Sequence, residues 1–185
     1  MLAALLLPRL LDNRPDRPVM ICGALVLVTA LSALSLMALV YETQWIPLLA
    51  GWFIIGIGYS AVLTPSGRLL KRSAHAEDRP AVYAAQFALS HACWLVTYPL
   101  TGWLITVSGP MVAFAVLAVL AGIGVVCGMV LWPQESGGPV THSHDDLPKD
   151  HPHVQDGTTH SHSIVIDDYH PHWPRVRQIQ RHSGQ

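Results

Sequence analysis

The sequence predicts an all-α integral membrane protein, with four transmembrane helices followed by a disordered, histidine-rich tail. Three observations support this prediction. Of the residues, 51% are hydrophobic and only 12% are charged. Four segments run uncharged for the length of a bilayer, and the last part of the chain carries repeated His-x-His pairs. Such a composition indicates a membrane protein.

The opening run, Met1–Leu11, is apolar but too short to span a bilayer. It does not read as a signal peptide, because no basic region precedes it and no small-residue cleavage site follows it. We expect residues 1–18 to be the end of a truncated helix and a basic cytoplasmic loop, with Met1 not the natural start of the folding unit. The alternative is a short interfacial segment in a complete small protein.

Four spans of bilayer length follow in residues 19–132. A transmembrane helix needs about 20 apolar residues to cross roughly 30 Å of hydrocarbon, and each span meets this length. The expected spans are Val19–Tyr41, Trp45–Gly67, Ala81–Val107 and Pro110–Trp132. Glycines in the second span, Gly51, Gly56 and Gly58, and Gly124 and Gly128 in the last, predict close helix packing.

Orientation follows from the basic residues. In the helical part every Lys and Arg falls near the start of the chain or in the connection 68–80, whereas the connections 42–44 and 108–109 have none. The positive-inside rule places both basic loops, and therefore the tail, in the cytoplasm of a cell bounded by an inner (plasma) membrane.

The basic loops also contain candidate gating residues. Arg68 and Arg72 follow a predicted helix C-terminus, where cations complement the helix dipole, and Asp12 and Arg17 lie in the first loop. The loop Arg68–Pro80 could be a latch that exchanges ion pairs between transport states. Plain topological anchoring is the competing interpretation.

The span 81–107 holds most of the intramembrane polarity. Gln86 and Ser90 lie on one helical face, and His91 and Tyr98 form a neighbouring row. Polar groups in hydrocarbon must face protein or water, so these residues, with Tyr59 and Thr64 of the second span, are candidates for a substrate pathway.

Apart from tyrosines and cysteines, His91 is the only ionisable side chain within the four spans. An imidazole can ligate a divalent cation and exchange a proton for it. The alternative is a histidine that is hydrogen-bonded to a neighbouring helix. Because no Asp or Glu lies within the spans, a carboxylate that carries coupling protons would have to come from elsewhere.

The tail, residues 133–185, begins with a Pro- and Gly-rich linker and is expected to be disordered without a ligand. It contains an internal repeat, and its candidate metal ligands are His142, His144, His151, His153, His160, His162, His170 and His172. Imidazole suits nickel, cobalt, copper and zinc, which favours a metal-buffering role over a merely solvated tail. Ser163–Ile166 is strand-like and could dock on the helical part.

Two stretches resemble a known family. In residues 8–17, Leu10, Asp12 and Arg17 match the loop motif of major facilitator superfamily transporters, although Pro8 and Pro15 replace its glycines. Residues 63–103 look like bacterial permeases of the nickel- and cobalt-resistance type. The resemblance implies the end of helix eight and helices nine to twelve of a 12-helix bundle, and it implies cation efflux.

The leading hypothesis is a fragment of a secondary transporter that exports divalent transition metals such as nickel or cobalt. One alternative is a small membrane-anchored protein that stores metal without transport, and another is a permease for small-molecule efflux. The expected partners are the lipid bilayer, the missing N-terminal helices and transition-metal ions, with no nucleic acid. We expect no enzyme activity and no cofactor, because no nucleophile and base pattern is present.

Overall fold

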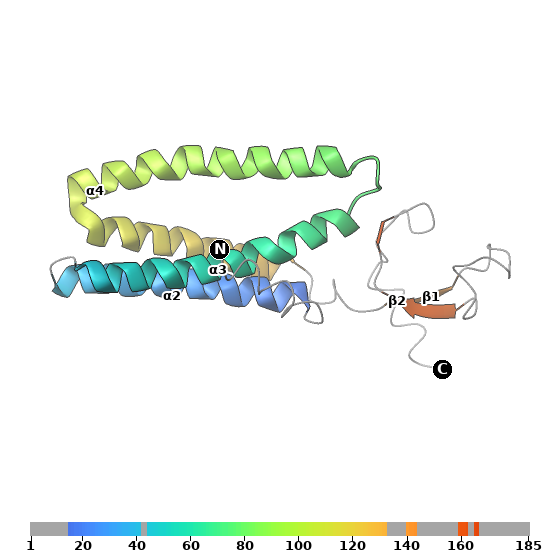
Figure 1. Ribbon diagram of the computed structural model, residues 1–185, viewed down its shortest axis with the longest axis horizontal. Helices are drawn as coiled ribbons and strands as arrows, with labels where there is room; N and C mark the ends of the chain where they lie inside the picture. The colour runs from blue at the N-terminus through green and yellow to red at the C-terminus, as the bar shows by residue number, and fades with distance from the viewer. Residues whose placement is uncertain (1–14, 42–43, 133–139, 144–158, 163–164, 167–185) are drawn as a thin grey trace.

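The computed structural model describes residues 15–41, 44–132, 140–143, 159–162 and 165–166 (Figure 1). This part of the chain contains helices α2 (Asp16–Val40), α3 (Trp45–Arg72) and α4 (Arg79–Leu131), and strands β1 (Val140–Ser143) and β2 (Thr159–His162). Within the described residues, these three helices are long and apolar enough to cross a membrane. The chain is therefore a multi-pass integral membrane protein.

Helix α2 starts three residues before the predicted span, at Asp16 instead of Val19, and ends one residue before Tyr41. Pro15 is extended and directly precedes the helix, and Asp16 lies in the first turn, where a negative charge complements the helix dipole. At the other end, the backbone N–H of Tyr41 donates to the carbonyl of Met37 at 2.9 Å. This bond closes the last turn before the short connection to α3.

Helix α3 continues five residues beyond the predicted end of its span at Gly67, to Arg72. Pro65 lies inside it, almost completely buried, and its missing N–H removes one helical hydrogen bond. The hydroxyl of Ser66 donates to the carbonyl of Leu63 at 2.6 Å. Figure 1 shows α3 bending away from α2 in its last turns, the place where the proline interrupts the bonding pattern.

The last two expected spans, 81–107 and 110–132, both lie in α4, which consists of two helical segments that meet at a kink, so four separate helices are not confirmed. A straight helix of its 53 residues would be about 80 Å long, far more than a bilayer of roughly 30 Å. Gly109 resolves the mismatch: its φ of 81° and ψ of 173° are non-helical, and Figure 1 shows α4 doubling back there. We call residues 79–108 the first arm and residues 110–131 the second arm.

Gly109 allows this reversal because it has no Cβ. A positive φ is strained for other residues, and Pro110, with its fixed φ, then suits the first turn of the second arm. The two residues that sequence reasoning assigned to a short outer loop, Ser108 and Gly109, therefore lie inside α4 as a sharp turn.

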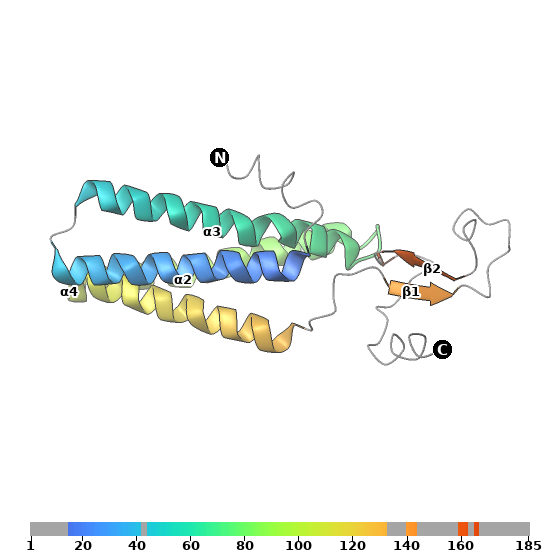
Figure 2. The same cartoon turned by 90° about the horizontal axis from the view of Figure 1, so that it is seen from below.

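Helix α2 lies between α3 and the second arm, as Figure 2 shows. Its small residues and Leu34 are buried on these sides, and Ala113, Ala118 and Val125 are buried on the second arm. The hydroxyl of Ser35 also donates to the carbonyl of Met111 at 2.9 Å, which joins α2 to the start of the second arm. These three segments form the packed core of the helical part.

Close packing between α2 and α3 depends on glycine. A Cβ on Gly58 would lie 2.8 Å from the backbone oxygen of Gly23, and a Cβ on Gly51 would lie 2.6 Å from a methyl of Leu34. The predicted packing role is thus confirmed at Gly51 and Gly58.

The remaining glycines of that prediction behave differently. A Cβ on Gly56, Gly124 or Gly128 would meet nothing within 4 Å among the described residues, so close packing is not confirmed at these three positions. Each lies on a side of its helix that no described neighbour covers.

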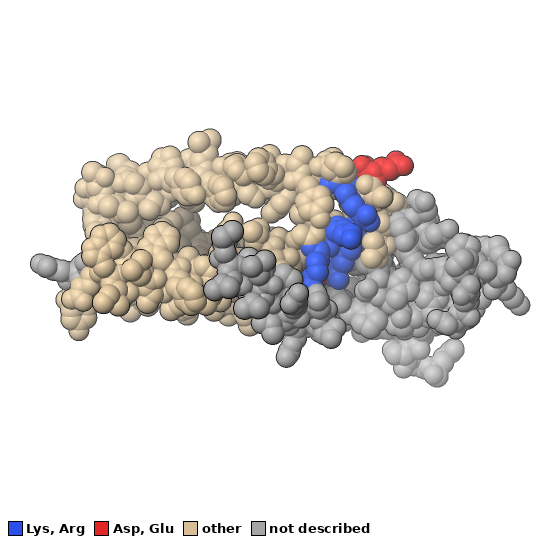
Figure 3. Space-filling model, viewed as in Figure 1, with Lys and Arg blue, Asp and Glu red and all other residues tan. Residues whose placement is uncertain are grey.

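The first arm stands apart from the core. In Figure 3 an open space separates it from the other helices over much of its length. Near its start it is attached to α3: the Tyr83 hydroxyl donates to the carbonyl of Gly67 at 3.0 Å, and the Arg79 Nε donates to the carbonyl of Lys71 at 3.0 Å. At its other end it joins the second arm at Gly109.

The tail forms a two-stranded antiparallel sheet from β1 and β2 (Figure 1). The prediction of a disordered tail therefore does not hold for these strands, and the rest of the tail, with Val165 and Ile166 excepted, lies outside the described residues. Docking of the segment 163–166 is confirmed at Ile166. This residue is 6% exposed, and its N–H donates to the carbonyl of Arg72 at 2.9 Å.

Candidate functional site

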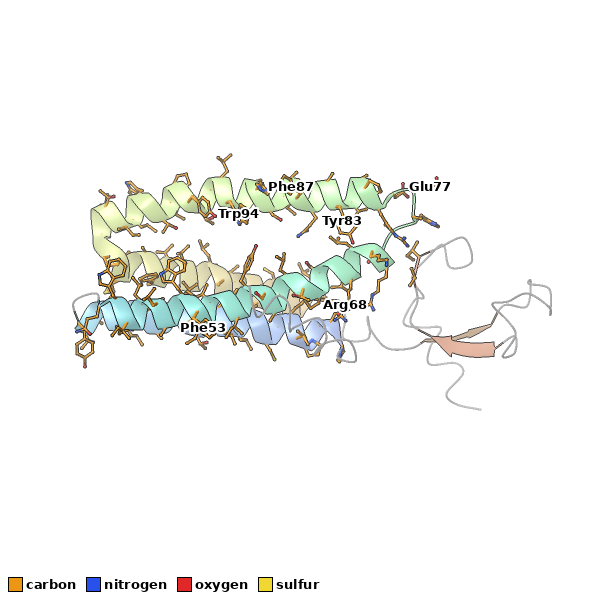
Figure 4. The ribbon with its side chains drawn as sticks, viewed as in Figure 1. Phe53, Arg68, Glu77, Tyr83, Phe87 and Trp94 are labelled. Carbon is orange, nitrogen blue, oxygen red and sulfur yellow. The ribbon has the colours of Figure 1, made fainter. Side chains whose placement is uncertain are left out.

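The first arm of α4 carries a row of ring side chains, Phe87, His91, Trp94 and Tyr98, which we call the aromatic row. The ring centroids are 3.8 Å apart between Phe87 and His91, 4.7 Å between His91 and Trp94, and 6.1 Å between Trp94 and Tyr98. The spacing of four, three and four residues places all of them on one helical face. Figure 4 shows Phe87 and Trp94 along this arm, with Tyr83 reaching toward the end of α3.

Within this row His91 has a defined hydrogen-bonding role. Its Nδ1 lies 2.8 Å from the carbonyl oxygen of Phe87. Because a carbonyl can only accept, Nδ1 must carry the proton, and in the neutral ring Nε2 then keeps its lone pair. His91 is exposed in the described chain, so Nε2 is available to a ligand or to a partner helix.

The other polar residues of this arm bond within their own helix. The hydroxyl of Ser90 donates to the carbonyl of Gln86 at 2.7 Å, and the hydroxyl of Thr101 donates to the carbonyl of Thr97 at 2.7 Å. Such bonds satisfy a hydroxyl in an apolar medium without a second helix. Gln86 and Ser90 are half-buried and lie on the same arm as His91.

Two other predicted pathway residues belong to α3. Tyr59 is 46% exposed, and Thr64, which directly precedes Pro65, is half-buried. The structure thus brings Gln86, Ser90, His91 and Tyr98 together on the first arm, while Tyr59 and Thr64 lie on another helix. A pocket of about 310 Å³ is present near the α2–α3 connection, but its lining residues Met37, Tyr41, Gln44 and Pro47 include none of these.

A second polar centre lies at the opposite end of the helices, around Asp16. This carboxylate is 7% exposed and accepts a hydrogen bond from the Arg68 guanidinium at 2.8 Å, with Arg72 at 3.7 Å. The negative charge lies at the N-terminus of α2, and the two arginines lie in the last turns of α3. Both positions complement the helix dipoles, so the cluster ties α2 to α3 in a favourable arrangement.

Sequence reasoning identified only part of this cluster. It singled out Arg68 and Arg72 but not Asp16, and Asp12, which it also singled out, lies outside the described residues. The available signal was the position of Asp16 directly after Pro15, which is typical of a helix start.

Arg17 connects a further helix to this end of the molecule. Its guanidinium donates to the carbonyl of Met129 at 3.1 Å, near the C-terminus of α4, where carbonyls lack helical partners. Figure 3 shows the Lys and Arg side chains of the described residues gathered at this end, which we call the basic end. Arg68 and, at the tip of the α3–α4 connection, Glu77 are labelled in Figure 4.

The predicted metal ligands divide into two groups. His142, His160 and His162 lie in the strands, with His142 opposite His160 in the register, whereas His144, His151, His153, His170 and His172 lie outside the described residues. Among the described helices and their connections, no group of three or more His, Cys, Asp or Glu side chains is arranged to hold a metal ion.

Comparison with known proteins gives one match. A family model for the Major Facilitator Superfamily matches residues 1–168, which include all three helices and both strands. No curated protein and no solved structure matches the chain.

Proposed function

Because this chain belongs to the Major Facilitator Superfamily, a family of transporters rather than enzymes, we propose that it acts in the export of divalent transition-metal cations such as nickel or cobalt. Secondary transporters of this kind bind their cargo near the middle of the bilayer and alternate access between two helical bundles. The helices described here would supply part of one bundle, and helices packed against the first arm would supply the rest.

The observation that carries the proposal is the exposure and hydrogen bonding of the His91 ring. An ionisable side chain is costly in a membrane unless it faces protein or water, and His91 has an exposed ring with Nε2 unoccupied by its own helix. Nε2 of the neutral ring carries a lone pair and no proton, so it could bind a divalent cation directly while Nδ1 stays bonded to the Phe87 carbonyl. The half-buried side chains of Gln86 and Ser90, on the same arm, would add oxygen ligands to the pathway.

The tail would serve the same cargo on the cytoplasmic side. Its imidazoles suit borderline cations such as Ni²⁺, Co²⁺ and Zn²⁺. With the basic end and the tail in the cytoplasm of a cell bounded by an inner membrane, the tail would collect ions below the pathway and deliver them to it.

The experiment is an accumulation assay in cells that carry the chain at its native locus. Replacement of the chromosomal allele by His91→Gln should raise retained radioactive nickel or cobalt several-fold, because the imidazole ligand is lost while a polar side chain remains. His75→Gln, in the α3–α4 connection, is the matched control and should leave retention unchanged. Equal retention in all three strains would rule out metal export through His91.

A second candidate, efflux of small organic molecules, is favoured by the aromatic row. Phe87 is 64% exposed, Tyr98 is 67% exposed and Trp94 is 39% exposed, so three rings are available to stack against an apolar or cationic organic ligand. Such a substrate would depend on ring surface rather than on the Nε2 lone pair.

Two variants separate the candidates. Trp94→Leu keeps an apolar side chain but removes the ring face, whereas His91→Gln keeps polarity but removes the metal ligand. Metal export predicts a defect in the His91 variant only. Organic efflux predicts a larger defect in the Trp94 variant, seen as sensitivity to organic compounds that does not depend on added metal.

A further inference from the structure

The last four carbonyls of α3 have no partner within that helix, as at any helix C-terminus. They belong to Leu69, Leu70, Lys71 and Arg72. The backbone N–H of Ser73 donates to the first two at 3.0 and 3.2 Å, and the Nε of Arg79, at the start of α4, donates to the third at 3.0 Å. The last carbonyl accepts from the backbone N–H of Ile166 at 2.9 Å, so the tail completes the C-terminal cap of α3.

Arg72 also connects this cap to α2. Its guanidinium lies 3.7 Å from the carboxylate of Asp16, and its side chain is only 16% exposed. Two apolar residues are buried close to the same helix end, since Ile166 is 6% exposed and Ala74 is 7% exposed. One residue of α3 thus contacts the tail through its backbone and α2 through its side chain.

The tail also leaves the helices at this end. It follows the C-terminus of α4, where the Arg17 guanidinium donates to the carbonyl of Met129 at 3.1 Å and so ties this terminus to the start of α2. Because α2 lies between α3 and the second arm, the tail starts on one side of α2 and is anchored on the other (Figure 2). Residues 132–166, which we call the strap, therefore link the ends of the two helices that flank α2.

We propose that the strap holds the basic end of the helices closed while Ile166 is docked on α3. Alternating access requires the helix ends on one side of the membrane to separate. A contact made only in the closed arrangement stabilises it, and loss of that contact shifts the equilibrium toward the open one. The strap needs a transporter that opens at its basic end, but it acts for any cargo, so this inference goes beyond the proposed metal export.

Two buried positions of the second arm can report where the helices open. Val125 is 8% exposed and lies toward the basic end, whereas Ala113 is 1% exposed and lies toward the opposite end. The full chain is studied in detergent micelles with Cys22, Cys93 and Cys127 replaced by serine, and it carries either Val125→Cys or Ala113→Cys. The rate of reaction with a water-soluble maleimide then measures how often each position becomes exposed.

Ile166→Ala removes the buried side chain of the strap and leaves the helices unchanged. It should raise the reaction rate at position 125 about tenfold, because the lost apolar contact favours the open arrangement, and it should leave the rate at position 113 unchanged. Val165→Ala is the matched control. This neighbouring side chain is only half-buried, and the N–H that binds α3 belongs to Ile166, so the rate at position 125 should change far less.

Three results would overturn the strap. Equal rates at position 125 with and without Ile166→Ala would show that the tail docks without holding the helices. A matching rise at position 113 would indicate a general loss of stability, and an equal rise with Val165→Ala would deny Ile166 its role. The measurement contains no metal, so the strap can stand when His91→Gln cells retain no extra nickel or cobalt, and metal export can stand when the strap fails.

Discussion

At the scale of single residues, Asp16 and His91 differ in their burial and in their hydrogen-bond partners. Asp16 is buried at a helix start, and arginines from α3 neutralise it. His91 is exposed on the first arm, and only its Nδ1 is bonded, to its own helix. A buried charge with partners indicates a structural contact, whereas an intramembrane histidine with an open nitrogen indicates a ligand or a partner not among these helices.

Asp16→Asn should loosen the join between α2 and α3 at the basic end. The change removes the charge that holds Arg68 and Arg72, so we expect a loss of about 1–2 kcal/mol in unfolding free energy, at the low end because the Arg68 side chain is 37% exposed. Asp78→Asn, an acidic residue of the same region, is the control and should cost much less. Denaturant titration in detergent, followed by tryptophan fluorescence, measures both; similar losses would contradict a special role for Asp16.

At the scale of elements, the three helices differ in how much of their surface they bury against one another. Helix α2 packs on both α3 and the second arm, through small residues that bring the backbones close. The first arm is attached through Tyr83 and Arg79 near one end and through Gly109 at the other, and most of its side chains are exposed. It is therefore the element with the most surface available to further helices of a transporter bundle.

Two glycines of α3 provide a matched test of this packing. Gly58→Ala would place a Cβ 2.8 Å from the backbone oxygen of Gly23, which cannot move without shifting the helix. We expect a cost of about 1–3 kcal/mol from overpacking. Gly56→Ala has no atom within 4 Å of its new methyl and should be neutral or slightly stabilising, because alanine favours helix. Thermal unfolding in detergent distinguishes them, and equal behaviour would argue against close contact of α2 and α3.

At the scale of the whole molecule, charge is sorted to one end. The starts of α2 and α4 and the end of α3 carry the described Lys and Arg side chains, and the anchored tail joins the same end (Figure 3). The connection 41–44 and the reversal at Gly109 lie at the other end (Figure 1). This sorting is what the positive-inside rule requires of a protein with its basic end and tail in the cytoplasm.

Single cysteines test that orientation in intact cells. In a chain whose Cys22, Cys93 and Cys127 are replaced by serine, Glu77→Cys at the basic end should resist a membrane-impermeant maleimide until the cells are opened. Gln44→Cys, at the start of α3, should react without lysis. The reverse pattern would place the tail outside and remove its role as a cytoplasmic collector.

Particular elements show how far sequence reasoning extends. The spans of α2 and α3, the basic end and the family were all predictable, because long uncharged runs have few stable states in a bilayer other than helices. The predicted break at residues 108–109 is found at Gly109, whose positive φ reverses the chain between the two arms of α4. The tail was predicted to be disordered, which does not hold at β1 and β2. Strand pairing between positions 18 residues apart, such as 142 and 160, has no characteristic local sequence pattern.

The sequence by itself determined the membrane environment, the approximate helices and the supply of imidazole ligands, because these depend on composition and on local periodicity. Only the tertiary structure decided that Asp16 pairs with Arg68 and Arg72, that Nδ1 of His91 bonds to its own helix, and that Ile166 ties the tail to α3. The physical reason is that hydrogen bonds and ion pairs act over a few ångströms, so partners far apart in the chain are selected by the approach of helices and strands in space.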